Sequence, residues 1–206
     1  MLNCSGNTPK KCSHSNVVQS ALSYLILKQF DAVGLTLFND HLIEKIPPRS
    51  KPSHFQHIVH GLELFEPSGN TLISQVIGEI TEELPIRSMV LLVSDLFTSE
   101  DDLYEKLKLI CSRGLEVIVF HVLHSDEIHF PFEGDIVFES LEEDPDVSLD
   151  PADIRESYQN IIQGIIQSYQ KNMPSLGVDY VFMETATPLD QALNYYLLRR
   201  KSLHKT

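Results

Sequence analysis

Basic residues are scarce in this chain. Its 206 residues include 16 Lys plus Arg against 29 Asp plus Glu, which gives a formal net charge of −13. Nucleic acids and anionic membranes attract positively charged surfaces, so this balance argues against both as general partners. No apolar run approaches the roughly 20 residues that a bilayer-spanning helix needs, and we expect no membrane span.

Cysteines are also few. Cys4, Cys12 and Cys111 form no Cys-x-x-Cys pair and leave an odd count, which fits a reducing compartment better than a disulfide scaffold. The first residues, MLNCSGNTPKK, lack the apolar core of a signal peptide. We therefore expect a cytoplasmic protein.

The strongest structural signal is the stretch 88–95, SMVLLVSD, in which five apolar residues precede a serine and an acid. A short apolar run of this kind is typical of a strand buried on both faces of a parallel sheet. Asp95 then stands at the carboxyl end of that strand. In open α/β sheets this is the end at which ligands bind.

Strands and helices are expected to alternate along the rest of the chain. We expect helices over 16–29, 53–64, 70–83, 100–112, 150–172 and from residue 187, and strands over 31–38, 41–46, 115–123 and 178–183, with a possible small hairpin at 136–141 and 146–149. The two consecutive prolines at 47 and 48 are expected to stop the second strand.

This order predicts a single α/β domain over 1–206, with helices on both sides of a mostly parallel, Rossmann-like sheet. Residues 1–15 are expected to form a polar loop, 125–150 an acidic excursion poor in helix, and 200–206 a frayed tail. A buried strand should precede the first helix, but only two apolar residues stand there. We expect that this strand is largely missing, or that the true start lies upstream.

Three polar clusters are expected to converge at the carboxyl edge of such a sheet. They contain Asn3, Ser5 and Asn7 in the first, Thr71 in the second, and Asp95 in the third. Hydroxyl, amide and carboxylate oxygens are the ligands that Mg²⁺ prefers. For Asp95 and Thr71 the competing interpretation is helix capping, and for Ser5 and Asn7 it is turn formation.

Several motifs resemble the DUF58 family of von Willebrand factor A-like proteins. They are LxxSGN, QFDAVGLTLF, GNT, LLVSD, RGLEVIVFHVLHSDEIHFPFEG and DYVFMETATPLDQAL, in that order. The resemblance implies a von Willebrand factor A-type, Rossmann-like fold that lacks most of its first strand. It also implies a protein-interaction module that works with a MoxR-type AAA+ ATPase in complex assembly or chaperone-like maturation.

The resemblance further implies a metal-ion-dependent adhesion site (MIDAS), for which Ser5, Thr71 and Asp95 match the family pattern. Asn3 stands where an aspartate is expected, and Asn7 where a second serine is expected. Because affinity for hard ions follows ligand charge, the loss of one carboxylate predicts a weak or lost Mg²⁺ site.

Enzymatic readings receive less support. A metal-dependent hydrolase with His121 or His124 as base is the alternative, but it lacks the several carboxylates that two-metal sites use, and only Asp95 is expected to be exposed at a strand end. His54, His57 and His60 are expected to lie on a solvent-exposed face of a helix, which explains them better than a zinc site does. We therefore expect a protein that is not an enzyme.

Overall fold

Helices and strands alternate along most of the chain. The computed structural model describes residues 8–38, 42–65, 73–86, 88–133, 136–138, 147–149, 151–191, 193–194 and 197–198. In chain order the elements are α1 (Thr8–Lys28), β1 (Val33–Phe38), β2 (Leu42–Arg49), α2 (His54–Leu64), α3 (Ile73–Glu83), β3 (Met89–Ser94), α4 (Glu100–Ser112), β4 (Glu116–Leu123), α5 (Ser125–His129), β5 (Ile136–Phe138), β6 (Val147–Leu149), α6 (Pro151–Asn172), a 3₁₀ turn η1 (Met173–Leu176) and β7 (Val178–Glu184).

The centre of the fold is a parallel sheet with the strand order β3-β4-β7. Leu92 of β3 lies opposite Val119 of β4, and Val119 lies opposite Tyr180 of β7. All three belong to one apolar cluster, whereas Ile118 and Phe120 belong to a second cluster on the opposite face. Successive side chains of a strand point to opposite faces, so β4 is buried on both sides, as its continuous apolar run predicts.

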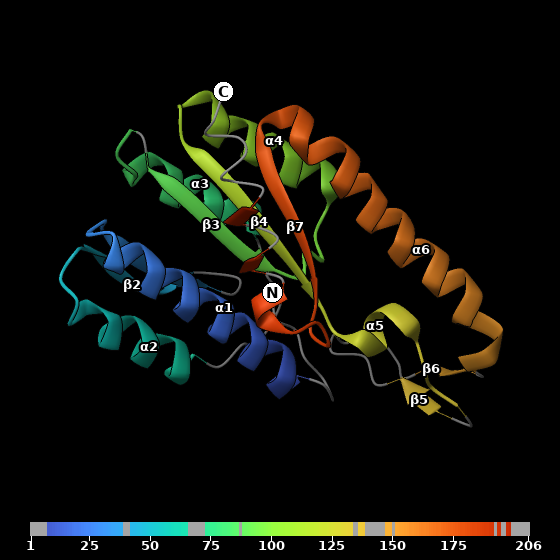
Figure 1. Cartoon of the computed structure of the whole chain (residues 1–206). Helices are drawn as coiled ribbons and strands as arrows, with labels where there is room; N and C mark the ends of the chain where they lie inside the picture. The colour runs from blue at the N-terminus through green and yellow to red at the C-terminus, as the bar shows by residue number, and fades with distance from the viewer. Residues whose placement is uncertain are drawn as a thin grey trace.

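Helices cover both faces of this sheet (Figure 1). On one face α3, α4 and α6 contribute to the first cluster, and α4 does so through Leu103, Leu107 and Ile110 at helical spacing. On the other face α1 contributes Val18 and Leu22. The predicted α/β class with a parallel, Rossmann-like sheet flanked by helices is therefore confirmed. Within the described ranges, no helix combines the length and apolar character needed to span a bilayer.

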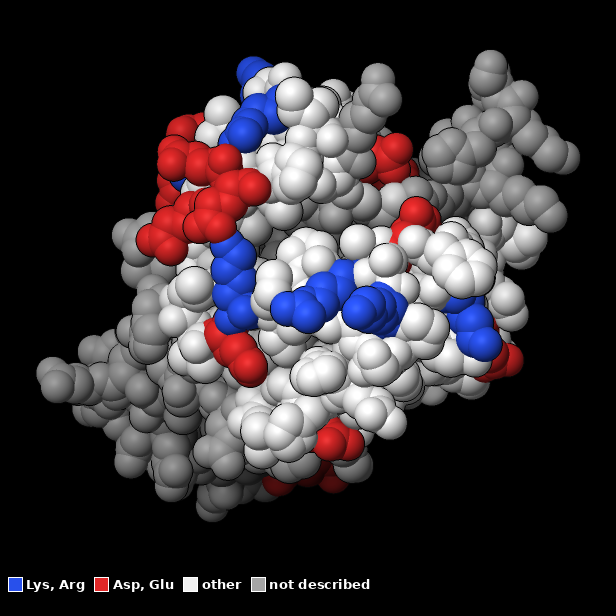
Figure 2. Space-filling model, turned by 90° about the vertical axis from the view of Figure 1, so that its left-hand side faces the viewer, with Lys and Arg blue, Asp and Glu red and all other residues white. Residues whose placement is uncertain are grey.

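The β1–β2 hairpin forms an antiparallel pair outside the parallel sheet. It packs on α2 around Leu37, Ile58 and Leu62, and the Asn16 side chain of α1 donates a hydrogen bond to the Leu62 carbonyl at 2.9 Å. Figure 2 shows the side of the molecule where this hairpin and α2 lie: Lys and Arg side chains cross its middle, and Asp and Glu side chains gather above them. The excess negative charge is therefore unevenly spread.

Three boundaries differ from the sequence-based expectations. Helix α1 begins at Thr8, so the expected polar loop over 1–15 is wrong for its second half. The residues from 8 to 15 are mostly polar and show no helical spacing of apolar residues. Pro9, however, suits a first helical turn. Strand β2 continues through both prolines to Arg49, because it is an edge strand that tolerates residues without an N–H group. The region 125–150 begins with helix α5.

Candidate functional site

Asp95 is the one predicted metal-site residue that lies within the described part of the chain. Asn3, Ser5, Asn7 and Thr71 fall outside it, as do the expected first strand and the tail 200–206. Asp95 directly follows β3, as predicted, at the carboxyl end of the sheet. It is only 1% exposed, however, so the expectation of an exposed carboxylate is wrong.

The loop after β3 has a constrained backbone. The Leu96 N–H donates to the Ser94 hydroxyl at 3.1 Å, and Leu96 adopts a left-handed backbone conformation with φ of 55°. A non-glycine residue enters this region only when its surroundings hold it there. Here the Leu96 side chain inserts into the core, where it is 2% exposed. Phe97 consequently stands half-exposed at the carboxyl edge.

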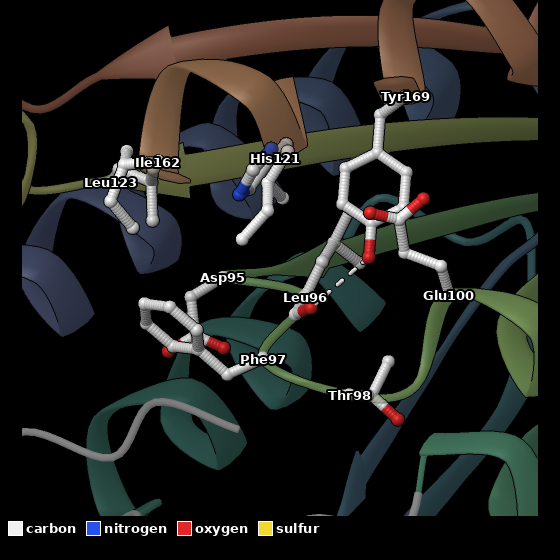
Figure 3. Close-up of a pocket in the computed structure, with 10 residues that line it drawn as sticks. Asp95, Leu96, Phe97, Thr98, Glu100, His121, Leu123, Ile162 and Tyr169 are labelled. Carbon is white, nitrogen blue, oxygen red and sulfur yellow. Dashed lines mark hydrogen bonds between the residues drawn. The ribbon is translucent and has the colours of Figure 1, made fainter. Parts of the chain in front are cut away.

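A cavity of about 240 Å³ lies beneath this loop. Its walls come from the β3–α4 loop, the end of β4 and the middle of α6. Figure 3 shows the loop residues along one side, with His121, Tyr169 and the apolar side chains Leu123 and Ile162 facing them. The full lining consists of Asp95, Leu96, Phe97, Thr98, Glu100, His121, Leu123, Ile162, Ile165 and Tyr169.

Two buried tyrosine hydroxyl groups make hydrogen bonds at the cavity: Tyr169 lines it, and Tyr180 bonds the lining residue His121. His121 Nδ1 and the Tyr180 hydroxyl share a hydrogen bond of 2.7 Å, and the Tyr169 hydroxyl donates to the Leu96 carbonyl at 3.3 Å. Burial raises the pKa of both tyrosines above the ordinary value, with smaller contributions from Glu100 and Tyr104 for Tyr169 and from other tyrosines for Tyr180. Both phenols therefore remain protonated and act as fixed hydrogen-bonding groups.

A polar network joins α4 to α6 at the rim of the cavity. Glu100 Oε2 accepts hydrogen bonds from the Ser168 hydroxyl at 2.6 Å and from the Tyr104 hydroxyl at 3.2 Å. Asn172 donates in turn to the Ser168 hydroxyl at 3.3 Å. Glu100 stands in the first turn of α4, where an acidic residue complements the helix dipole. Its contact with α6 spans 68 residues, and no local pattern predicts such a contact.

The two histidines of the hydrolase alternative both have structural contacts. His121 packs edge-to-face against Tyr169 and shares a hydrogen bond with Tyr180. His124 caps α5: its Nδ1 accepts the Asp126 N–H at 3.2 Å, and the Glu127 carboxylate accepts the His124 N–H at 2.7 Å. Within the described ranges, no three His, Cys, Asp or Glu side chains are grouped closely enough to hold a metal ion.

Comparison with known proteins agrees with this fold. A family model described as "Protein of unknown function DUF58" matches residues 3–164. The crystal structure of BatB, a conserved hypothetical protein from Bacteroides thetaiotaomicron, aligns with a TM-score of 0.57 and 15% identity, over 95% of this chain and 89% of that one.

A second similar structure is an aerotolerance-related membrane protein from Bacteroides fragilis NCTC 9343, determined with multiple mutations to serines. It aligns with a TM-score of 0.52 and 18% identity, over 86% of this chain and 85% of that one. At these identities the two structures show similarity of fold alone. No protein with a curated description matches the chain.

Proposed function

The chain belongs to the DUF58 family, and from this premise we propose that it is a non-catalytic protein-interaction module that presents the carboxyl edge of its sheet to a partner protein. The observation that carries the proposal is Phe97, an aromatic side chain that is 50% exposed beside the cavity. Aromatic side chains next to concave surfaces are frequent anchors of protein interfaces.

The loop geometry supports an interaction role for Phe97. Two hydrogen bonds fix the backbone on either side of it: Leu96 N–H to the Ser94 hydroxyl, and Thr98 N–H to the Leu96 carbonyl at 2.8 Å. A side chain on a fixed loop loses little conformational freedom when a partner covers it. An exposed aromatic group held in this way costs less to bury in an interface than one on a flexible segment.

The proposed partner is a MoxR-type AAA+ ATPase, and the proposed role is complex assembly or chaperone-like maturation. This choice follows the resemblance of the chain to von Willebrand factor A-like proteins. A weak or lost Mg²⁺ site at Asp95 is part of the proposal: the other four ligands of the implied set lie outside the described residues, and Asp95 is the carboxylate in the set. The proposed binding role requires no chemical reaction at this edge of the sheet.

A binding measurement with matched variants tests the proposal. The purified chain is titrated onto an immobilised MoxR-type ATPase from the same organism in the presence of ATP. One titration series contains Mg²⁺ and the other contains EDTA. Phe97→Ala should weaken binding by at least about tenfold, as loss of an interface anchor does. Ile86→Ala is the control, because Ile86 is 78% exposed and precedes the opposite end of β3.

The outcomes separate the parts of the proposal. Equal binding by Phe97→Ala and the parent chain would reject this edge as the docking surface. Binding that survives both EDTA and Asp95→Ala would reject a role for Mg²⁺ and leave a metal-free module. Absence of binding to the ATPase would reject that partner.

A further inference from the structure

The cavity beneath Phe97 has the size of a single side chain. Its volume of about 240 Å³ is below the roughly 300–1,000 Å³ of typical small-molecule pockets. Leu123, Ile162 and Ile165 give it an apolar wall. A nucleotide or a cofactor of similar size exceeds this space, whereas one extended side chain of a partner protein fits it.

The charged groups that line the cavity are all acidic or imidazole. Glu100 contributes a half-buried carboxylate, Asp95 belongs to the wall but is only 1% exposed, and His121 contributes its ring; the described lining contains no lysine or arginine. Asp101 and Asp102, both exposed, add negative charge in the first turn of α4. The helix dipole accounts for acids in that turn. It does not account for a cavity that has Glu100 and an apolar wall in its lining.

We propose that this cavity receives an arginine side chain from the partner protein. The methylene stem of the arginine lies along Ile162 and Ile165 of α6, and its guanidinium group faces the half-buried carboxylate of Glu100. A guanidinium group is weakly hydrated and pairs with carboxylates and aromatic faces, which suits a site that also contains Phe97 and Tyr169. The inference rests on the proposed function, since it names the chemistry that the partner brings to the same edge.

The inference distinguishes this edge from a metal-dependent one. A Mg²⁺ ion at Asp95 calls for an acidic group from the partner to complete its ligand set. An arginine in the cavity calls for a basic segment and no metal. The two possibilities therefore predict partners of opposite charge. A positively charged probe should bind if the cavity receives an arginine, and a negatively charged probe should bind if the edge holds Mg²⁺.

A small probe tests the cavity without any partner. N-acetyl-arginine methylamide is titrated into the full chain carrying ¹³C-labelled isoleucine and leucine methyl groups. We expect saturable shifts at Ile162, Ile165 and Leu123, at least tenfold weaker binding of N-acetyl-citrulline methylamide, and weaker arginine binding at high salt. Citrulline has nearly the same shape but no charge, so equal binding of the two probes would overturn the inference. So would shifts confined to other methyl groups.

Variants locate the binding site. Glu100→Gln should weaken arginine binding several-fold, whereas Glu116→Gln, at the opposite end of β4, should not. Because Glu100 also bonds Ser168 and Tyr104, its variant is accompanied by Ile165→Phe, which fills the apolar wall and leaves every carboxylate in place. Arginine binding that is unchanged in Ile165→Phe overturns the inference.

The two proposals fail in different ways. If arginine does not bind the cavity but Phe97→Ala weakens binding of the ATPase, the docking edge stands and the arginine inference falls. If arginine binds the cavity but Phe97→Ala leaves ATPase binding unchanged, the proposed function falls while the chemistry of the cavity stands.

Discussion

Replacing Tyr180 with phenylalanine removes the hydroxyl group that bonds His121, a residue in the lining of the cavity. That hydroxyl shares a 2.7 Å hydrogen bond with His121 Nδ1, and the two residues are 4% and 1% exposed. A buried polar group that loses its partner costs about 1–3 kcal/mol, because water cannot replace the lost bond. For a chain of this size each kcal/mol lowers Tm by roughly 2–4 °C.

Urea unfolding followed by circular dichroism measures the loss, with Tyr24→Phe as the matched control. Tyr24 is 46% exposed, so removal of its hydroxyl should change the free energy of unfolding by less than about 0.5 kcal/mol. The double variant His121→Phe with Tyr180→Phe should cost less than the sum of the two single changes, because it leaves no unpaired partner.

Two results would refute this reasoning. A loss below about 0.5 kcal/mol in Tyr180→Phe would mean that the hydrogen bond contributes little to holding His121. Strict additivity of the two changes would mean that the residues act independently, and the inner wall of the cavity would then depend on packing alone.

Three further predictions concern the core, the response to pH and the segment after α5. Leu107→Ala should cost about 2–5 kcal/mol in urea unfolding because the residue is fully buried, whereas Leu109→Ala on the same helix, 49% exposed, should cost under about 1 kcal/mol. Burial raises the pKa of Tyr169 and Tyr180, so the folded state keeps protons that the unfolded state releases above about pH 10. The contribution of these tyrosines to the free energy of unfolding is therefore intact below that pH, and it should fall by about 1.4 kcal/mol per pH unit above it for each tyrosine. Urea unfolding between about pH 9 and about pH 11 measures this slope. The slope should be smaller in Tyr180→Phe. Arg155 donates two hydrogen bonds to backbone carbonyls after α5, and Arg155→Lys loses one of them. Amide hydrogen exchange at 129–133 should therefore accelerate, with little change in global stability. Unchanged exchange would contradict this prediction.

The parallel sheet was predictable because its strands carry their own signal. Strands β3, β4 and β7 lie within a residue or two of the expected ranges, since a strand buried on both faces must be apolar at nearly every position. Helix α4 was predictable for a second reason: a serine and three acids precede its apolar residues, as the helix dipole favours. Both signals are local, and neither depends on contacts with distant parts of the chain.

The sequence-based predictions of element boundaries were wrong where tertiary structure overrides a local sequence rule. Pro47 and Pro48 break most strands, but β2 is an edge strand with one side free of ladder bonds, so the prolines are tolerated. Helix α5 begins at a histidine cap, His124, and histidine is not among the side chains that usually mark a helix start. No pattern in the sequence distinguishes either case.

The site was predictable only in its position along the chain. A polar residue at the end of a buried strand indicated Asp95, and the structure places it there. Its surroundings include the left-handed turn at Leu96, whose carbonyl accepts a hydrogen bond from Tyr169 of α6, 73 residues further along the chain. The cavity itself depends on how α6 packs beside the end of β4 and the loop after β3, and no local spacing in the sequence encodes this packing.

The charge of the site decides which cation suits it. Mg²⁺ gives up its water only to several anionic oxygens held in octahedral geometry. The ligand set predicted from the sequence has asparagine at positions 3 and 7, so Asp95 is its one carboxylate. A guanidinium group carries one positive charge, spreads it over a plane, and needs one or two carboxylates with an apolar surface for its stem. The arginine proposed above requires one carboxylate and an apolar surface, and the cavity beside Asp95 has Glu100 and the apolar wall in its lining.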